Sequence, residues 1–271
     1  MIKKNTLQES AVFEGIGVHT GKKSRATVHP EHTDGITFLK NGVRIPALFD
    51  CLESAKFGLN LKNDGETVRT VEHFLACLTA LDIWDATIEL EGDELPILDG
   101  SAAPILNEIE SVGIVPTGEE VEPLLIDEEY FVEDQGRNVQ LDYYGKFFLD
   151  VTIDYLHPSI GVQKWSGLMN AEVFKNEIAY ARTFGFLKDE KLLKAKNFAL
   201  GASLENSVIF ADDDIVNERG LRLESEPVRH KVLDLLGDLA LFGRPVLGRI
   251  TSFKGGHELN MKLMSRLWHG Q

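Results

Sequence analysis

The chain has 271 residues, of which 43% are hydrophobic and 26% are charged. This length and composition suit a globular protein with one large domain or two ordinary domains. The formal net charge of −15, from 28 basic and 43 acidic residues, argues against a function that depends on nonspecific attraction to nucleic acid or to an anionic membrane surface.

Two cysteines occur, Cys51 and Cys77, and neither belongs to a CxxC pair or to a disulfide framework. The N-terminus lacks the apolar core of a signal peptide, and no segment approaches the roughly 20 apolar residues that a membrane-spanning helix requires. We therefore expect a protein of the reducing cytoplasm without a transmembrane segment. Any phosphate on a substrate must then be met by local lysines and arginines.

The first part of the chain alternates β-patterned segments with two helices. Strands are predicted at residues 10–18, 24–28, 86–90 and 95–98. A turn at residues 19–21 joins the first two strands into a hairpin. A helix is predicted over residues 71–81, where apolar residues keep helical spacing and Thr70 can act as the cap. Ser101 is predicted to cap a second helix that runs toward Gly113.

Residues 115–123 are rich in Pro, Gly and Glu, which is typical of an exposed linker. We place a domain boundary there, between domains at residues 1–118 and 123–271. In the second domain, strands are predicted near residues 124–132, 138–143, 147–155, 207–210 and 247–253. Helices are predicted near residues 170–181, from Pro227 and from His257. The sequence thus predicts an α+β fold of two similar domains, each a β-sheet layered against helices.

The helix that begins at Pro227 carries the most informative spacing in the chain. His230 and Asp234 stand one helical turn apart, so their side chains share a face and could hold one metal ion. Asp238 continues this polar stripe, which runs beside the apolar stripe and faces a cleft or solvent. An ordinary solvated surface pair has the same spacing, so this helix alone leaves both interpretations open.

Glu72 and His73 occupy the first turn of the predicted helix at residues 71–81. The positive end of the helix dipole favours a neutral imidazole, the form that binds metal, and an ionised carboxylate. Taken alone, the pair is better explained as a glutamate that complements the dipole beside a partly exposed histidine. Together with His230 and Asp234, however, the pair would complete a catalytic zinc site with an adjacent base.

His257 follows Gly255 and Gly256 at the start of the last predicted helix. Two glycines let the backbone turn sharply and approach a ligand, and we expect the histidine to be exposed at this turn. A flexible surface turn with a solvated histidine is the alternative interpretation.

The combined motifs resemble a known family. They are Thr70-Val71-Glu72-His73, Ala181-Arg182-Thr183-Phe184-Gly185-Phe186, Glu226-Pro227-Val228-Arg229-His230-Lys231-Val232-Leu233-Asp234-Leu235-Leu236-Gly237-Asp238-Leu239 and Lys254-Gly255-Gly256-His257. Residues 13–21 and 95–101 extend the match over nearly the whole chain. In order and spacing these motifs closely resemble those of the UDP-3-O-acyl-N-acetylglucosamine deacetylases, the zinc amidases that catalyse the committed step of lipid A biosynthesis in Gram-negative bacteria.

The resemblance implies two domains with the active site between them and one catalytic Zn²⁺ ion. His73, His230 and Asp234 would be its ligands, with water completing the tetrahedron. Glu72 would be the base that deprotonates this water for attack on the acetamide carbonyl. His257 would then protonate the leaving amine.

The resemblance also implies roles for residues around this centre. Asp238 would hydrogen-bond to His257, raise its pKa and fix its orientation. Thr183 would donate a hydrogen bond to the oxyanion of the transition state. Lys231 would meet the diphosphate or sugar end of the substrate, and Lys254 would assist it.

The substrate implied is a small molecule, an acylated UDP-N-acetylglucosamine, bound by a protein that we expect to be a monomer. Phe184 and an insert at about residues 185–210 resemble the hydrophobic passage that holds the acyl chain, and His19 is a further substrate contact. Ala202 stands where the family often has glycine, so its methyl group narrows the passage. Residues 53–59 also depart from the loop of some relatives, which leaves the acyl-chain length open.

Two alternative hypotheses remain beside that of a deacetylase for an acylated UDP-sugar. A zinc amidase for another N-acetylated sugar would use the same centre without needing the acyl chain. A non-catalytic protein with a structural metal is a second alternative. Structural zinc sites usually have four protein ligands, often cysteines, and this sequence offers no such set.

Overall fold

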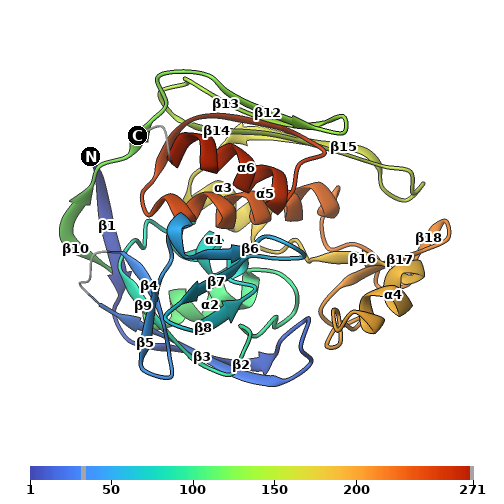
Figure 1. The fold of residues 1–271 in the computed structure, drawn as a ribbon, viewed down its shortest axis with the longest axis horizontal. Coiled ribbons are helices and arrows are strands. Elements are labelled where there is room, and N and C mark those ends of the chain that lie inside the picture. The colour runs from blue at the N-terminus through green and yellow to red at the C-terminus, as the bar shows by residue number, and fades with distance from the viewer. Residues whose placement is uncertain (32–34, 269–271) are drawn as a thin grey trace.

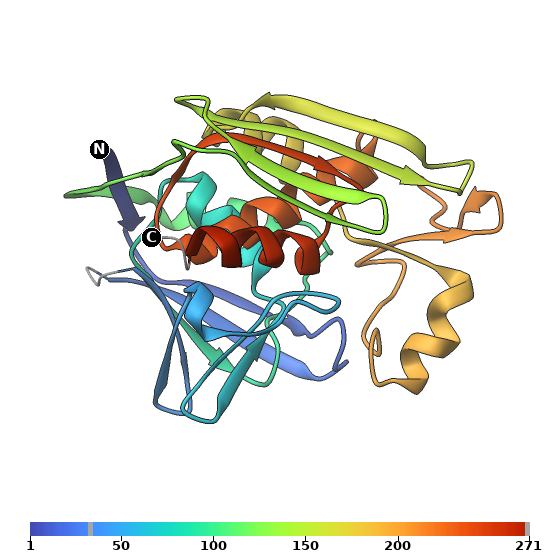
Figure 2. The same ribbon diagram turned by 45° about the horizontal axis from the view of Figure 1, so that its top comes forward.

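The computed structural model describes residues 1–31 and 35–268. Two β-sheets form the outer layers of the molecule, and helices fill the space between them (Figure 1). Figure 2 shows the same order after a rotation, with the blue strands on one side of the helices and the green and yellow strands on the other. Each sheet thus buries one face against helices, which accounts for the alternation of buried and exposed residues along its strands.

The first sheet has five strands in the order β2-β3-β9-β4-β5. They are β2 (Ala11–Ile16), β3 (Lys23–Pro30), β4 (Ile36–Lys40), β5 (Val43–Pro46) and β9 (Ala86–Glu91). Neighbours are antiparallel except β4 and β9, which are parallel. In β3, Ser24, Ala26 and Val28 are buried and the residues between them are more exposed, as period-two patterning predicts.

The second sheet has the order β12-β13-β19-β14-β15, with a short strand β11 beside β19. Its strands are β11 (Leu124–Leu125), β12 (Tyr130–Asp134), β13 (Arg137–Asp142), β14 (Phe147–Tyr155), β15 (Gly161–Leu168) and β19 (Val246–Phe253). Strand β19 is parallel to β14 and β11, and the remaining pairs are antiparallel. The single strand predicted at residues 124–132 is therefore two strands that pair with different partners.

The two five-stranded paths have the same topology. In each, the last strand in the sequence lies in the middle of the sheet and is parallel to the third. Each middle strand lies between two helices along the chain, α1 and α2 around β9, and α5 and α6 around β19. The predicted α+β fold of two similar halves is confirmed. The shared strand order shows that the two halves repeat one topology.

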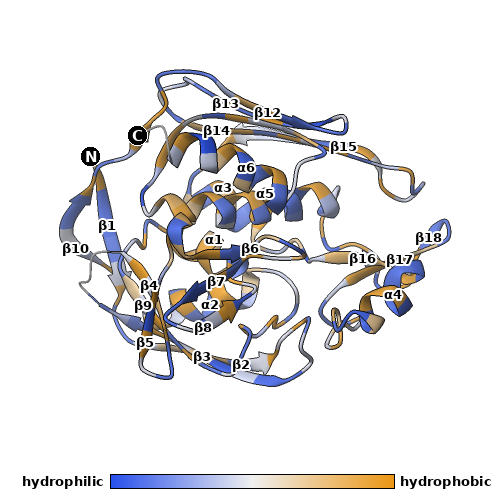
Figure 3. Ribbon diagram, in the orientation of Figure 1, coloured by the Kyte–Doolittle hydropathy of each residue, from blue (hydrophilic) through white to orange (hydrophobic). Residues whose placement is uncertain are grey.

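Four helices lie between the sheets. They are α1 (Glu72–Ala80), α2 (Ala103–Val112), α5 (Glu226–Leu239) and α6 (His257–Trp268). Every residue of α5 except Arg229 and Lys231 is buried, so this helix runs through the centre of the core. Gly243, which ends the short helical turn that follows α5, has a φ of 68°, the left-handed conformation that glycine often adopts just beyond a helix. Figure 3 shows hydrophobic and hydrophilic residues alternating along the ribbons of these helices.

Shorter helical segments differ from the prediction. The helix predicted near residues 170–181 is a short α3 (Ala171–Val173) followed by a π-helical turn (Phe174–Ile178). Helix α4 (Glu190–Ala195) lies in the insert, where no helix was predicted. Single 3₁₀ turns occur at Phe49–Cys51, Leu187–Asp189 and Ala240–Phe242. Among the described residues, no helix has the length and apolar character needed to cross a membrane.

Two three-stranded sheets flank the layers. One comprises β6 (Leu52–Ser54), β7 (Asn60–Asn63) and β8 (Glu66–Arg69), which the sequence did not predict. The other comprises β16 (Phe184–Phe186), β17 (Val208–Ala211) and β18 (Asp214–Ile215). Together with α4, this second sheet extends from one edge of the molecule (Figure 1).

Most of residues 115–123, which have the composition of an exposed linker, belong to a strand. Strand β10 (Ile114–Val121) pairs with β1 (Ile2–Leu7) as an antiparallel ribbon. No residue of β10 is fully buried, which explains its polar, linker-like composition, and a partner more than 100 residues away cannot be recognised from local sequence. The domain boundary drawn at this segment stays a prediction.

Three local predictions also change. Thr70 does not cap α1, because its hydroxyl donates a hydrogen bond of 2.8 Å to Glu94. Ser101 precedes the capping residue of α2 by one position, although its hydroxyl accepts a hydrogen bond from the N–H of Ala103 at 3.2 Å. Residues 95–98 form no strand and turn back along the edge of the first sheet. The change at Thr70 has a tertiary cause, the hydrogen bond to Glu94, whereas the bonds of the Ser101 side chain are local.

Candidate active site

Helices α1 and α5 pack directly against each other at the centre of the molecule. Gly237 makes this approach possible, because a Cβ atom there would lie 2.7 Å from the Cα and carbonyl carbon of Glu72, closer than carbon atoms pack. Glycine inside a helix costs about 1 kcal/mol relative to alanine. The first turn of α1 consequently lies against α5, and this brings Glu72 and His73 to His230 and Asp234.

His73, His230 and Asp234 form a buried group that could hold a metal ion. Their potential ligand atoms all lie within 4.8 Å of one another. Oδ1 of Asp234 is 3.3 Å from Nε2 of His230 and 3.9 Å from Nε2 of His73. The two imidazole rings meet edge to face, with centroids 5.1 Å apart. The two halves of the chain thus bring these three residues together in one group of potential ligands.

Both histidines are in the form that binds a metal. Burial, together with a smaller contribution from the neighbouring His230, lowers the pKa of His73 to about 3. Burial also lowers the pKa of His230, although Asp234 opposes the change. The Nδ1 atom of His230 lies 3.0 Å from the carbonyl oxygen of Ala181, to which it must donate, so Nε2 presents its lone pair toward Asp234.

The carboxyl group of Asp234 is ionised although it is buried. Burial alone would raise its pKa, but the positive charges of Lys231 and His257 hold it well below the usual range. The ammonium of Lys231 donates a hydrogen bond of 2.6 Å to Oδ2 and lies 5.6 Å above the ring of Phe184. Two neutral imidazoles and one carboxylate therefore form a donor set that suits zinc.

Glu72 lies beside this group with its side chain buried. Desolvation raises its pKa to about 7, against the opposing effect of His257. The N–H of Leu59 donates a 2.9 Å hydrogen bond to Oε2. At Gly58, where φ is 144°, a Cβ atom would lie 2.9 Å from Oε1 of Glu72. The loop at residues 58–59 thus fits closely around the carboxylate and needs glycine for that approach.

His257, Asp238 and Asn260 form a hydrogen-bonded chain behind the metal-binding group. Nδ1 of His257 lies 2.6 Å from Oδ1 of Asp238, and Asn260 donates a 2.6 Å hydrogen bond to Oδ2. Burial lowers the pKa of His257, but Asp238, Asp234 and Glu72 outweigh it and raise the pKa to about 10. His257 is therefore a protonated imidazolium close to a carboxylate whose pKa is near 7.

The expected exposure of His257 at a turn is wrong, because only 12% of its side chain is accessible. A Cβ atom on the preceding Gly255 would lie 3.1 Å from Cγ2 of Val139, so the turn is packed against β13. Local sequence shows two flexible glycines, whereas the fold uses one of them for close packing.

A cavity of about 470 Å³ opens over these groups. The predicted site residues that line it are His19, Glu72, His73, Thr183, Phe184, Ala202, His230, Lys231, Asp234 and His257. Asp238 lies behind His257 and is fully buried. Lys254 does not line the cavity, and its ammonium pairs with Asp154 at 2.7 Å. Its predicted contact with the substrate thus gains no support from the geometry.

Thr183 enters the cavity from a segment held on both sides. Its N–H donates to the carbonyl of Gly100 at 2.7 Å, and its carbonyl accepts from the N–H of Val208 at 2.8 Å. The preceding Arg182 is bonded through Nε to Oε1 of Glu226 at 2.8 Å, in an ion pair that is almost fully buried. This pair connects the start of α5 to Thr183, and nothing in the local sequence indicated it.

The far part of the cavity is apolar. It is lined by side chains of the insert and of the loop at residues 53–59, among them Phe57, Phe186, Leu187, Leu193, Leu204 and Ile209. The rings of Phe57 and Phe198 lie 4.8 Å apart, and that of His19 lies 5.4 Å from Phe198. The sequence identified the insert but missed Phe57 as a lining residue and Phe198 as the ring that packs against Phe57 and His19.

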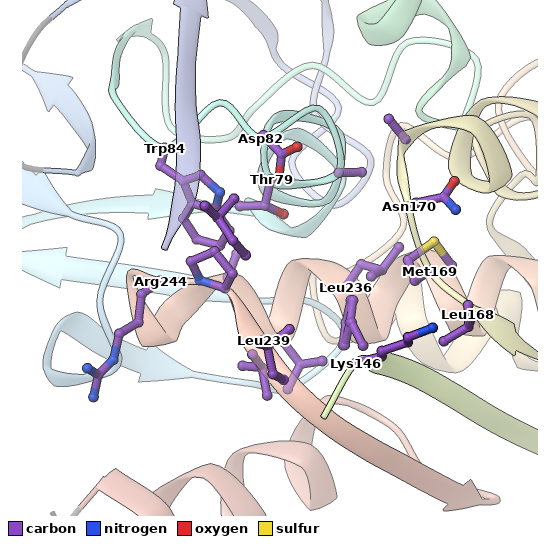
Figure 4. Close-up of a pocket in the computed structure, with 18 of the residues that line it drawn as sticks. Thr79, Asp82, Trp84, Lys146, Leu168, Met169, Asn170, Leu236, Leu239 and Arg244 are labelled. Carbon is purple, nitrogen blue, oxygen red and sulfur yellow. The ribbon is translucent and has the colours of Figure 1, made fainter. Parts of the chain in front are cut away.

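A second cavity, of about 450 Å³, lies at the other end of α5 (Figure 4). Trp84, Leu236, Leu239 and Met169 line it, and Lys146 extends across one side. No residue predicted for catalysis, metal binding or substrate binding lines it. Of these two cavities, the first joins the predicted chemistry to an apolar passage.

Comparison with known proteins agrees with this geometry. A family model described as UDP-3-O-acyl N-acetylglycosamine deacetylase matches residues 4–269. A relative from Aquifex aeolicus (strain VF5), named UDP-3-O-acyl-N-acetylglucosamine deacetylase, is 40% identical over 97% of this chain and 92% of its own length. Relatives with the same name from Myxococcus xanthus (strain DK1622) and Haemophilus influenzae (strain 86-028NP) are 39% and 38% identical, each over 97% of this chain and over 86% and 89% of their own lengths. The chain belongs to the UDP-3-O-acyl N-acetylglycosamine deacetylase family.

Proposed function

We propose that this chain is a zinc-dependent deacetylase that hydrolyses the acetamide of a UDP-3-O-acyl-N-acetylglucosamine, the committed step of lipid A biosynthesis. One observation carries the proposal: a His-His-Asp group, a glutamate with a raised pKa and a protonated histidine converge on a cavity with an apolar extension. The names of the relatives support the same activity. We further propose that the protein acts as a monomer in the cytoplasm.

His73, His230 and Asp234 would hold the zinc ion. Three protein ligands with a position left for water or substrate are typical of catalytic zinc, whereas structural zinc usually has four. When bound, zinc would lower the pKa of a water molecule and polarise the acetamide carbonyl. The neutral imidazoles and the ionised carboxylate fit this ion without a further change of protonation.

Glu72 would act as the general base. Its pKa of about 7 matches a residue that must accept a proton from water at neutral pH and later release it. The N–H of Leu59 orients one carboxylate oxygen and leaves the other able to meet the water. The hydroxyl of that water becomes bonded to the acetyl carbon, and its proton moves to Glu72.

His257 would act as the general acid. Its Nδ1–H is directed to Asp238, so the proton on Nε2 is the one available to the substrate. When the C–N bond breaks, the amine nitrogen takes this proton and leaves as the glucosamine amine, with acetate as the other product. Two groups with pKa values near 7 and 10 thus divide the roles of base and acid.

The remaining cavity residues would bind and orient the substrate. Thr183 would donate a hydrogen bond to the developing oxyanion from a segment that is fixed on both sides. Lys231 would meet the sugar or diphosphate end while it also restrains Asp234. Phe184, Ala202 and His19 would contact the acyl chain or the sugar next to it.

Metal removal and restoration on the acylated substrate tests this function. We expect chelation to abolish acetate release and zinc to restore it, whereas UDP-N-acetylglucosamine without the acyl chain should be a poor substrate. Glu72→Ala should retain zinc and lose activity, and the exposed Glu120→Ala should behave as wild type. Full activity of Glu72→Ala at unchanged metal content would refute the assignment of the base. Equal turnover of the non-acylated sugar would refute the substrate.

A further inference from the structure

Glu94 is a buried carboxylate that the chemistry above does not use. Its residue is 1% exposed, and no lysine, arginine or histidine side chain in the described residues forms an ion pair with it. A buried carboxylate without a cation is costly unless hydrogen bonds satisfy both oxygens. Here Oε1 accepts from the N–H of His19 at 3.0 Å and the hydroxyl of Thr70 at 2.8 Å. Oε2 accepts from the N–H and the hydroxyl of Thr20, both at 2.8 Å.

These hydrogen bonds connect two segments that both line the active-site cavity. His19 and Thr70 are themselves lining residues. His19 also forms hydrogen bonds with the loop at residues 53–59 and with the insert. Its Nε2 donates to the carbonyl of Phe57 at 2.7 Å, and its Nδ1 accepts from the N–H of Ala199 at 3.3 Å. The His19 carbonyl also accepts from the N–H of Leu200 at 3.1 Å. Glu94 therefore restrains His19, and His19 in turn forms the hydrogen bonds to the insert.

The backbone at Gly17 and Thr70 has a conformation that allows these hydrogen bonds to Glu94. A Cβ atom on Gly17 would lie 2.6 Å from Cδ of Glu94, so only glycine lets the loop close over the carboxylate. Thr70 has a φ of 57°, a left-handed conformation that is strained for a β-branched residue. Such strain persists only where surrounding contacts compensate it, and the hydrogen bond to Glu94 is one of these contacts.

We propose that Glu94 is a positioning residue for the acyl passage: by accepting hydrogen bonds from His19, Thr20 and Thr70, it fixes the wall that His19 forms with Phe57 and Ala199. The proposal rests on the proposed function, because it concerns the same cavity. Glu94 touches no reacting atom, so its effect should appear in substrate binding and should depend on the acyl chain. The metal-binding group is held separately by α1 and α5.

Glu94→Gln is the informative substitution. Glutamine keeps the size of the side chain but presents one NH₂ group in place of an acceptor. In either orientation this group faces a backbone N–H, of His19 or of Thr20, that cannot turn away. The adjacent Asp93→Asn makes the same chemical change on a half-exposed carboxylate that pairs with Lys22, and serves as the matched control.

The experiment measures kcat, KM and zinc content with substrates that carry short, medium and long acyl chains. For Glu94→Gln we expect KM for the long-chain substrate to rise about tenfold or more, as the loss of hydrogen bonds to a charged group implies. The change in kcat should stay below about threefold, since Glu72 and His257 are held elsewhere. The rise in KM should diminish as the chain shortens, while one zinc per chain is retained. A purely structural role would lower the melting temperature without any dependence on chain length.

Thr20→Val provides a second variant, because it removes one hydroxyl and keeps the carboxylate and the shape. It should raise KM for the long-chain substrate about two- to fivefold. Kinetic constants of Glu94→Gln and Thr20→Val equal to those of Asp93→Asn, or an effect on KM that is the same for every chain length, would overturn the inference. If wild type and Asp93→Asn fail to release acetate from any of these substrates, the proposed function fails instead.

Discussion

Gly237→Ala tests whether the close approach of α1 and α5 creates the active site. Alanine is the better helix former by about 1 kcal/mol, so propensity alone predicts a more stable protein. In the structure, however, the new Cβ would lie 2.7 Å from two backbone carbons of Glu72. Carbon atoms pack at about 3.5 Å or more, so the helices must separate by roughly 0.8 Å. Because the obstacle is backbone, no side-chain rotation can relieve the overlap.

We expect two consequences of this separation. Overpacking a core typically costs about 1–3 kcal/mol, which should exceed the gain in helix propensity and lower the melting temperature by a few degrees. Glu72 and His73 would also move relative to His230 and Asp234, and a misplacement of about 1 Å can cost about 100-fold in rate. We therefore expect kcat/KM to fall by about two orders of magnitude.

The assay combines thermal unfolding, zinc content and kcat/KM for acetate release. Ser265→Ala in α6 is the control, because it also favours the helix at a half-buried position without closing a gap between helices. It should change the free energy of unfolding by less than about 0.5 kcal/mol and leave the rate unchanged. A Gly237→Ala protein that is more stable than wild type and fully active would refute the packing argument.

Three further predictions concern protonation and metal. The proposed mechanism requires Glu72 ionised and His257 protonated, so kcat/KM should rise as pH increases through about 7 and fall as it increases through about 10, which a pH–rate profile measures. Asp238→Ala should leave zinc bound, slow turnover and move the alkaline limb to lower pH, because the carboxylate that raises the pKa of His257 is gone; loss of the metal would contradict the assignment. Removing zinc should lower the melting temperature, since a ligand at a thousandfold excess over its Kd stabilises the folded state by about 4 kcal/mol, and an unchanged melting curve would argue against a tightly bound ion.

More of the candidate site than of the fold could be predicted from the sequence. His230 and Asp234 share a face because their helix is regular, and Glu72 and His73 lie in a first turn, so local periodicity indicated both pairs. That these pairs form one site depended on the family resemblance. Local sequence contains no information about α1 lying against α5, although Gly237 in the middle of a helix was a visible irregularity.

The strands of the fold also divide into those that local sequence predicted and those that it did not. Strands with clear alternation, such as β3 and β14, were predicted, and β1, β10 and the β6–β8 sheet were missed or misread. Residues in β10 are exposed or half-buried, so its sequence has the composition of a linker while its hydrogen bonds come from β1. Strand propensity reflects packing against neighbours, and those neighbours are unknown before the chain is folded.

The sequence by itself determined the α+β class and the helix that carries His230 and Asp234, and its resemblance to the family predicted which residues we propose for metal binding and acid–base chemistry. Only the tertiary structure decided how deeply these residues are buried and which charges surround them. The raised pKa values of Glu72 and His257 and the buried, hydrogen-bonded Glu94 follow from that surrounding. The physical reason is that desolvation and electrostatic interaction depend on distance in space, whereas periodicity and helix position depend on distance along the chain.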